Sequence, residues 1–567
     1  MAVDQSPMNK LITEHIDIWT SAVKTKSASG RGSNKKLELY GVKKLRELIL
    51  ELAVRGKLVP QNPNDEPASF LLQRISEEKT QLIKEKKITK PKKLPAIKKQ
   101  DITFALPEGW QACYFGDIYS LVYGDNLPKA KRTESGEFLV YGSNGSVGTH
   151  NLFSVGSPCL VIGRKGSAGA INLSDQPCWV TDVAYSLIPP VGISLKYCFL
   201  HLQTLGLDSL GKGIKPGLNR NEANALVVCI PPSDEQHRIV AKVDELMALC
   251  DQLEQQTEAS IEAHQVLVTT LLDTLTNSAD ADELMQNWAR ISEHFDTLFT
   301  TEENIDQLKQ TILQLAVMGK LVPQDPSDEP AAELLKRIAE EKVQLVKEKK
   351  IKKQKALPPI SEDEKPFELP SGWEWCRLGN LFSFLNGFAF KSEWFNDKGI
   401  RLLRNINIAH SETKWADVVC VSAQLAKEYE KYSLNAGDIV ISLDRPIINT
   451  GLKYAVVDES DLPCLLLQRV AKFHSYAGTV SSSYLSKWLE SDLFMSSIDP
   501  GRSNGVPHIS TKQLEMLPFP LAPLSHQTRI SDKVDEMIYL CQQLEIRMKE
   551  SQITQAHLAD AIVAQED

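Results

Sequence analysis

The sequence predicts an α+β protein in which two globular α/β domains are separated by long antiparallel, coiled-coil-like helices, with a pseudo-twofold internal repeat. Three features indicate this fold class. Nearly identical segments occur twice along the chain. Apolar residues recur at helical spacing within those segments. The two stretches between them contain short β-rich runs, such as "SPCLVIG" (157–163) and "AGDIVISL" (436–443), separated by glycine, serine, asparagine and proline.

The repeat is strongest between residues 48–88 and 311–351, which are identical at 30 of 41 positions. It continues at the same offset of 263 residues into "LPEGWQACYFGDI", which starts at Leu106, and "LPSGWEWCRLGNL", which starts at Leu369. The similarity then fades. Each copy therefore has conserved flanks around a dissimilar middle.

Similarity returns between residues 236–254 and 526–545 at an offset of about 291, so the second copy holds about 28 additional residues in its middle. Residues 1–35 have no counterpart in the repeat. We expect six regions: an N-terminal extension (1–35), an N-terminal helical region (36–103), a first globular domain (104–232), a central helical region (233–365), a second globular domain (366–523) and a C-terminal helical region (524–567).

The flanks are predicted to be helical. Apolar residues at helical spacing open each copy: Leu45, Ile49, Leu52, Leu308, Ile312 and Leu315. Gly56 and Gly319 follow where a C-terminal helix cap is expected. A new helix should then begin at an N-capping aspartate with a proline in its first turn. The residues are Asp65 with Pro67, and Asp328 with Pro330.

The exit of each copy has apolar residues spaced 3, 4, 3, the a/d pattern of a helix that packs on a partner. These residues are Val243, Leu246, Cys250, Leu253, Val534, Met537, Cys541 and Leu544. The expected partner is the helix of the other half. Residues 36–56 and 524–560, near the two ends of the chain, would then pack against helices from the centre (233–320).

Composition limits the class of protein. A chain of 567 residues is expected to form about three or four domains, and 42% hydrophobic residues is ordinary for a soluble protein. No run of 18 or more apolar residues and no signal-peptide pattern occurs, so we expect no membrane span. Ten cysteines are scattered singly, without a Cys/His cluster, which argues against a zinc site or disulfide framework and fits a reducing cytoplasm.

Motifs for catalysis are incomplete. "GLDSLGKG" (206–213) resembles a phosphate-binding loop, but Gly213 stands where a magnesium-binding hydroxyl is needed and a helix is expected before it. "GSNGSVG" (142–148) and "GRKGSAG" (163–169) lack the dinucleotide-binding spacing. The chain has no Asn- or Asp-Pro-Pro-aromatic motif of adenine methyltransferases and no evident triad spacing. The "EEK" triplets (77–79 and 340–342) could serve a nuclease metal site, but their highly charged surroundings favour a solvated helix face.

Polar loops with Arg or Lys between glycines favour nucleic-acid binding instead. Arg donates two hydrogen bonds to guanine, Asn pairs similarly with adenine, and backbone amides hold phosphate. The first-domain candidates are Ser143, Asn144, Arg164, Lys165, Ser167, Lys212, Lys215, Asn219 and Arg220. The second-domain candidates are Lys391, Ser392, Arg404, Asn405, Arg445, Arg502, Ser503 and Asn504. Each alone is equally explained as an exposed loop residue, but the loops as a set favour binding.

The net charge of −9 requires local basic patches or a partner that supplies positive charge, because neutralising phosphates provides much of the affinity for DNA. Two basic runs, "KEKKITKPKK" (84–93) and "KEKKIKKQK" (347–355), precede the two globular domains. They are either solvated helix ends or contacts to phosphates.

Taken together, these features resemble the specificity subunit of a type I restriction-modification system over about residues 36–560. The resemblance rests on the repeated "LP-x-GW", on "YGSNG", "VIGRKGSAG" and "WVTD" of the first domain, and on "NGFAFKS" and "GDIVIS" of the second. The "PP-x-x-E-Q-x-x-I" exit (231–239) completes it. In the second copy Ala522 and His526 replace Pro231 and Glu235 of that exit.

The resemblance implies two target recognition domains, each reading half of a split, asymmetric double-stranded DNA site, with helices that act as a ruler. Half-site centres would lie roughly 34–36 Å apart. The chain would be non-catalytic and bind no cofactor. It would dock two modification subunits, which bind S-adenosylmethionine and flip out an adenine, and restriction subunits that use ATP and Mg²⁺.

Two other interpretations remain at this stage. A self-contained nuclease or ATPase would cleave DNA or hydrolyse nucleotide without partners. A stand-alone DNA-binding scaffold or repressor would bind DNA tightly alone and would not capture a methyltransferase.

Overall fold

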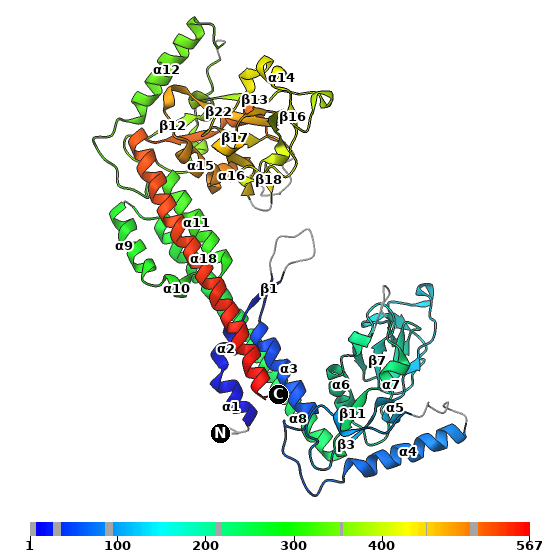
Figure 1. The fold of residues 1–567 in the computed structure, drawn as a ribbon. Helices are drawn as coiled ribbons and strands as arrows, with labels where there is room; N and C mark the ends of the chain where they lie inside the picture. The colour runs from blue at the N-terminus through cyan, green and yellow to red at the C-terminus, as the bar shows by residue number, and fades with distance from the viewer. Residues whose placement is uncertain are drawn as a thin grey trace. The chain divides into compact units, whose positions relative to one another are not determined.

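The computed structural model describes residues 7–26, 36–85, 94–210, 217–279, 281–351, 355–448, 451–498 and 508–566. They form two compact units (Figure 1). Unit 1 is built from the chain up to residue 259 together with the residues from 552 onward, and unit 2 from residues 260–551. Each unit contains an α/β domain and parts of two long helices, α8 (Ser233–Thr276) and α18 (Leu524–Glu566). This architecture confirms the predicted fold class.

In unit 1, helix α3 (Tyr40–Val54) packs with the first part of α8 and the last part of α18. The side chains predicted to face the core, those of Leu45, Ile49 and Leu52, are buried. Polar bonds fasten both neighbouring helices to α3. Arg46 pairs with Glu254 of α8 at 2.7 Å (Nη2 to Oε2). The Tyr40 hydroxyl donates to Asp560 of α18 at 2.8 Å.

In unit 2, helix α11 (Glu302–Val317) takes the place of α3. Lys309, which aligns with Arg46, pairs with Glu545 of α18 at 3.1 Å (Nζ to Oε2). Val268 of α8 and Val534 of α18 belong to the same hydrophobic core as α11. Helix α8 gives its first part to unit 1 and its last part to unit 2, whereas α18 does the reverse. Along the chain, α8 therefore runs from unit 1 into unit 2, and α18 runs from unit 2 into unit 1.

The predicted a/d seams are confirmed. Seven of the eight side chains are buried, with Leu253 half-buried. The buried residues are Val243, Leu246, Cys250, Val534, Met537, Cys541 and Leu544. The seams pack as expected because each long helix faces a short helix that precedes it in the repeat.

The repeat also reaches the N-terminal extension, for which the sequence indicated no counterpart. "ITEHID" (12–17) matches "ISEHFD" (291–296). In unit 1, α1 (Pro7–Glu14) is followed at His15 by α2 (Ile16–Ser21). In unit 2, α9 (Ala281–Ser292) is followed at His294 by α10 (Phe295–Leu298). The pair β1 (Lys24–Lys26) and β2 (Lys36–Glu38) is inserted before α3. This insertion gives the N-terminal match a different offset from the rest of the repeat.

After α3 and α11 the chain passes through two segments that we call the elbows, residues 55–67 and 318–330. Gly56 has a φ of +69° and Gly319 a φ of +71°, so the predicted glycine helix caps are confirmed. Helices α4 (Ala68–Lys84) and α12 (Ala331–Lys347) follow the elbows.

The predicted aspartate N-caps are wrong. Pro67 and Pro330 occupy the N-cap positions, and neither helix has a side-chain cap there. Asp65 instead accepts two hydrogen bonds from Arg238 of α8, at 3.3 and 2.6 Å. Asp328 in the same way accepts two from Arg529 of α18, at 3.1 and 2.5 Å. Each aspartate carboxylate binds an arginine instead of the helix N-terminus. Because that arginine is distant in sequence, local spacing does not reveal the pair.

Each elbow also covers the tryptophan of the "LP-x-GW" motif. The Trp110 indole N–H donates to Glu235 Oε1 at 3.1 Å, and Gln61 Nε2 donates to the same oxygen at 3.2 Å. In unit 2 the Trp373 N–H donates to Gln324 Oε1 at 3.1 Å and approaches His526 Nδ1 at 3.3 Å. His526 thus replaces Glu235 in a polar cluster of the same design.

The α/β domain of unit 1 contains two main sheets. The first has the order β4 (Val122–Tyr123), β10 (Ala184–Leu187), β7 (Cys159–Gly163), β8 (Ile171–Ser174). The second has the order β6 (Ser146–His150), β5 (Phe138–Tyr141), β9 (Cys178–Val180), with β5 and β9 parallel. The chain enters the domain through β3 (Gln111–Tyr114) and leaves it through β11 (Val227–Ile230), and these two strands pair. Between β10 and β11 the chain forms the helices α6 (Leu195–Thr204) and α7 (Arg220–Asn224).

The α/β domain of unit 2 repeats this topology with additions. Its first sheet has the order β13 (Phe382–Asn386), β22 (Val470–Ser475), β17 (Ile439–Ser442), β20 (Tyr454–Val456), β15 (His410–Ser411). Its second has the order β16 (Cys420–Val421), β14 (Ile400–Leu403), β21 (Cys464–Leu466), with β14 and β21 parallel. Strands β12 (Glu374–Arg377) and β23 (Pro518–Leu521) pair at the entrance and exit.

Further elements complete the two units. Unit 2 has a pair β18 (Ile447–Ile448) and β19 (Gly451–Leu452) and the helices α14 (Ala423–Glu428), α15 (Ser482–Glu490), α16 (Asp492–Ile498) and α17 (Thr511–Met516). The four-residue helices α5 (Phe115–Ile118) and α13 (Leu378–Leu381) follow β3 and β12. None of the described helices is long and apolar enough to cross a membrane.

The elbow glycines give a stability test. A Cβ at Gly56 would lie 2.6 Å from Pro107 Cγ, and one at Gly319 would lie 2.7 Å from Pro370 Cγ. Gly437 has a similar φ of +84° but nothing within 4 Å of its added Cβ. Gly437→Ala should cost about 1 kcal/mol of unfolding free energy from backbone strain alone. Gly56→Ala and Gly319→Ala should each cost about 1–3 kcal/mol more from overpacking.

Denaturant unfolding of the three variants measures these costs. Equal losses at all three glycines would mean that the elbows do not pack tightly on the tryptophans.

Candidate nucleic-acid interface

In unit 1, three segments meet where β7 ends, and we call this meeting point the first junction (residues 163–167, 182–183 and 217–220). The Arg164 backbone N–H donates to the Val183 carbonyl at 2.9 Å, and the Leu218 N–H donates to the Arg164 carbonyl at 2.9 Å. Lys165 and Gly217 form an isolated β-bridge. The first junction thus brings together two predicted pairs that are far apart in sequence, Arg164 with Lys165 and Asn219 with Arg220.

The turn after β5 lies against the first junction. A Cβ at Gly163 would lie 2.3 Å from the Ser143 carbonyl oxygen and 2.0 Å from that of Ser167. Only glycine allows these three backbone segments to approach so closely. The predicted residues Ser143 and Ser167 are therefore part of the same surface, with the exposed Asn144 beside them in sequence.

An aromatic residue that the sequence did not single out, Tyr123, organises the first junction. The guanidinium carbons of Arg164 and Arg220 each lie 5.2 Å from the centroid of its ring, a distance typical of cation–π contacts. Tyr185 on the neighbouring strand packs on Tyr123 with ring centroids 5.0 Å apart. Its hydroxyl donates to the Leu218 carbonyl at 3.2 Å, and burial raises the pKa of Tyr185 to about 12.

These groups line a hollow of about 270 Å³. Among the described residues that line it are three cations, those of Arg164, Lys165 and Arg220, and no carboxylate. Such a hollow favours an anion or the acceptor-rich edge of a base. Asn219 also lies here, but its side-chain oxygen accepts a hydrogen bond from the Asn221 N–H at 2.9 Å and caps α7.

Unit 2 contains the same backbone arrangement, the second junction (residues 442–446, 468–469 and 508–509). The Leu443 N–H donates to the Arg469 carbonyl at 2.8 Å, and the Ile509 N–H donates to the Leu443 carbonyl at 3.0 Å. Asp444 and His508 form the isolated bridge that corresponds to Lys165 and Gly217. The frame is therefore the same in both units, whereas the side chains that it presents differ.

A carboxylate lies at the centre of the second junction. Asp444 pairs with Arg469 at 3.0 Å and with His508 Nδ1 at 3.0 Å. Burial alone would raise the pKa of the Asp444 carboxyl, but Arg469 and the neighbouring cations hold it below its usual value. The predicted Asn405 donates to the Asp444 carbonyl at 3.0 Å and accepts from Lys453.

The other predicted residues of unit 2 are more dispersed. Arg445 is exposed beside Asp444 with a φ of +47°. The Arg404 guanidinium is engaged by Asp417, at 2.7 Å to its carbonyl and 3.0 Å to its carboxylate. Lys391 lies over the Trp394 ring at 5.5 Å, and Ser392 begins the short turn that carries Trp394. Lys212, Lys215, Arg502, Ser503 and Asn504 lie outside the described residues.

Sequence reasoning missed Tyr123, Tyr185, Asp444, Lys453, Arg469 and His508. One of these had a usable signal. At the offset of 263, Tyr123 aligns with Asn386, the first residue of the "NGFAFKS" segment that contains the candidates Lys391 and Ser392. Arg469 and Lys453 had none, because only the paired strands bring them to Asp444.

Comparison with known proteins identifies the family. A profile described as "Type I restriction modification DNA specificity domain" matches residues 107–263 and 370–555. The EcoAI specificity subunit of Escherichia coli is 53% identical over 98% of this chain and 99% of its own length. The EcoEI specificity subunit of Escherichia coli is 39% identical over the same shares. The chain belongs to the type I restriction-modification specificity subunits.

A solved chain from work on complex assembly and conformational transition of the type I R-M system has a TM-score of 0.47 and 16% identity, covering 82% of this chain and 98% of that one. Specificity subunits recognise DNA sequence and are non-catalytic, and the catalytic activities lie on other subunits of the assembly. The resemblance stated from the sequence is confirmed over nearly the whole chain.

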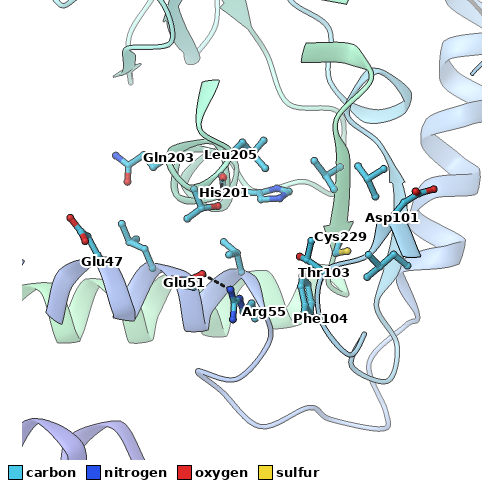
Figure 2. Close-up of a pocket in the computed structure, with 16 residues that line it drawn as sticks. Glu47, Glu51, Arg55, Asp101, Thr103, Phe104, His201, Gln203, Leu205 and Cys229 are labelled. Atoms are coloured by element: carbon cyan, nitrogen blue, oxygen red, sulfur yellow. Dashed lines mark hydrogen bonds and ion pairs between the residues drawn. The ribbon is translucent and has the colours of Figure 1, made fainter. Parts of the chain in front are cut away.

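A pocket of about 380 Å³ in unit 1 of this specificity subunit is lined by two ionisable groups that could take part in catalysis, His201 and Cys229 (Figure 2). Burial lowers the pKa of His201 to about 4 and raises the pKa of the Cys229 thiol to about 11. The nearby Arg55 is paired with Glu51, as the dashed line shows. At neutral pH the pocket therefore offers a neutral imidazole and a protonated thiol, which is not an activated nucleophile. No cluster of three or more metal-ligand side chains occurs among the described residues.

His201 makes the stability of unit 1 depend on pH. Its side chain is 3% exposed, and Tyr119 Oη lies 3.4 Å from its Nδ1. Between pH 4 and about 6.5 the unfolded chain binds a proton at this position that the folded chain does not. Unfolding free energy should therefore fall as the pH drops from 7 to 5, by about 2 kcal/mol from this residue.

Urea unfolding of His201→Gln at the two pH values tests this account, and the variant should lose most of that pH dependence. His557→Gln, at an exposed position on α18 in the same unit, is the control and should keep it. A His201→Gln variant with an unchanged pH slope would contradict the account.

Proposed function

We propose that each α/β domain reads one half of a bipartite, asymmetric DNA site and that the repeated helices set the distance between the halves. One observation carries this proposal. The two junctions share the same backbone hydrogen bonds but present Arg164, Lys165 and Val183 in one domain and Leu443, Asp444 and Arg469 in the other. A shared frame with different side chains has the form expected of two readers with different targets.

The proposed readers are the predicted loop residues that the structure describes, some of them at the junctions and others elsewhere in the same domains. In unit 1 they are Ser143, Asn144, Arg164, Lys165, Ser167, Asn219 and Arg220, and in unit 2 they are Lys391, Ser392, Arg404, Asn405 and Arg445. The candidates outside the described residues, Lys212, Lys215, Arg502, Ser503 and Asn504, belong to segments next to Gly217 and His508 of the junctions. The same segments in both domains therefore provide the remaining contacts.

The repeated helices support docking of two modification subunits. The exposed apolar side chains of α8 recur at equivalent positions of α18. Leu249 is 41% exposed and Leu540 is 45% exposed, and Leu267 and Leu558 are 48% and 45% exposed. Unit 1 holds Leu249 and Leu558, and unit 2 holds Leu540 and Leu267. Each unit therefore offers the same apolar pair to one copy of the same partner, and the native mass of the assembled complex counts these copies.

The partners would supply the chemistry. We propose that S-adenosylmethionine binds to the modification subunits, that ATP and Mg²⁺ bind to the restriction and translocase subunits, and that the complex acts in the cytoplasm. The net charge of −9 fits this division, since partners that clamp the duplex would supply the phosphate contacts. A purified chain that cleaved DNA alone would instead support a self-contained enzyme. One that bound DNA tightly without partners would support a scaffold.

Exchange of a whole domain tests the proposal directly. Residues 104–232 are replaced by the corresponding domain of another specificity subunit, and the hybrid is expressed with its modification partners. Methylated adenines are then mapped across the host genome by single-molecule sequencing. We expect one half of the methylated motif to change, because the second domain and both long helices remain.

The reciprocal exchange of residues 366–523 is the control and should change the other half alone. If either exchange altered both halves, or neither, the two domains would not be independent readers.

A further inference from the structure

The first junction holds one arginine in a fixed orientation. Arg164 Nε donates to the Asp182 carbonyl at 3.0 Å, and Nη2 donates to the same oxygen. The guanidinium carbon lies 5.2 Å from the Tyr123 ring centroid. One edge of the guanidinium is therefore bound by the protein and one face contacts an aromatic ring, which limits its rotation.

The outer edge of this guanidinium, between Nη1 and Nη2, still carries two parallel donors. Nε and one Nη2 hydrogen serve Asp182, so the outer Nη1 and Nη2 hydrogens form the remaining fork. Such a fork matches two adjacent acceptors in one plane. On the edge of a base pair in the major groove, guanine presents this pattern through O6 and N7, and an arginine fork is its commonest partner.

The surroundings favour a base edge over a lone phosphate. Tyr123 and Tyr185, whose rings are tilted by 56° to each other, line the hollow with aromatic side chains, and Lys165 and Arg220 provide further cations beside them. The orientation of Arg164 is fixed by the Asp182 carbonyl and the Tyr123 ring. The side chain of Lys165, in contrast, is exposed. An exposed lysine is suited to a phosphate, and a pre-oriented fork is suited to a planar base edge.

The second junction lacks this arginine. Leu443 makes the backbone hydrogen bonds that correspond to those of Arg164, and its side chain packs against the hydrophobic core of unit 2. The feature therefore belongs to the first domain alone. We infer that Arg164, oriented by Tyr123 and the Asp182 carbonyl, reads one guanine of the half-site bound by the first domain. This inference rests on the proposed function.

The test uses the full chain assembled with its modification subunits and duplexes of its methylated target. Each guanine of the half-site that follows the first domain is replaced singly by 7-deazaguanine, which lacks the N7 acceptor but keeps Watson–Crick pairing. At one guanine, this change should weaken binding of the wild-type complex by roughly 2- to 12-fold, half of a bidentate contact. Arg164→Ala should weaken binding to the natural duplex by roughly 5- to 150-fold.

The decisive result is the combination of the two changes. The Arg164→Ala complex should show no further loss from 7-deazaguanine at that position, whereas the other guanines should behave as in the wild type. Arg164→Lys keeps the charge but not the planar fork, so it should bind the natural duplex less tightly than the wild type. Tyr123→Phe keeps the ring and should retain the sensitivity to 7-deazaguanine. Lys165→Gln is the matched control, and it should weaken binding to all duplexes by about the same factor.

Two results would overturn the inference. One is a half-site for the first domain with no guanine on either strand. The other is an Arg164→Ala complex that loses affinity equally for target and unrelated duplexes, which indicates a phosphate contact. Unaltered binding of unrelated duplex by Arg164→Lys shows that the variant is folded. A wild-type complex with no bipartite target at all would instead defeat the proposed function.

Discussion

The buried contacts between each elbow and the start of a long helix are the constraint on which the rest of the structure depends. Asp65 bonds to Arg238 and Asp328 bonds to Arg529, with the side chains of the two aspartates 5% and 8% exposed. Gln236 and Gln527 lie beside these arginines, are fully buried, and accept the backbone N–H groups of Ser194 and Ser481 at 2.9 Å. A buried side chain that is fully hydrogen-bonded holds one geometry. Each α/β domain is therefore fixed to its own long helix, as the proposed spacing role of the helices requires.

Near-identity of the elbows follows from this role. A carboxylate left without its arginine in so buried a position would be costly. The elbow residues are therefore constrained by packing and pairing, whereas the junctions are constrained only in their backbone. That difference explains how one chain keeps two copies of a scaffold almost unchanged while its two readers diverge.

Most of the fold could be predicted from the sequence because the repeat and the a/d spacing can both be read from the order of residues alone. The structure corrected two expectations for physical reasons. The elbow aspartates do not cap helices, because Arg238 and Arg529, which lie 173 and 201 residues further along the chain, bind them in space. The N-terminal helices were not matched to α9 and α10, because the inserted pair β1–β2 changes the offset. Of the candidate site, glycine-bordered basic loops were visible in the sequence. Tyr123 and the Asp444–Arg469 pair depend on strand pairing and were not.

In the proposed function, the two junctions meet different halves of one DNA site. Site-specific photo-crosslinking tests it most directly, with a benzophenone side chain placed at position 165 or at position 444 of the chain in the assembled complex. The equivalent positions should give adducts with bases in opposite half-sites of the same duplex, with position 165 in the half that follows the first domain. Adducts from both positions in one half-site, or adducts spread evenly along unrelated duplex, would contradict the account.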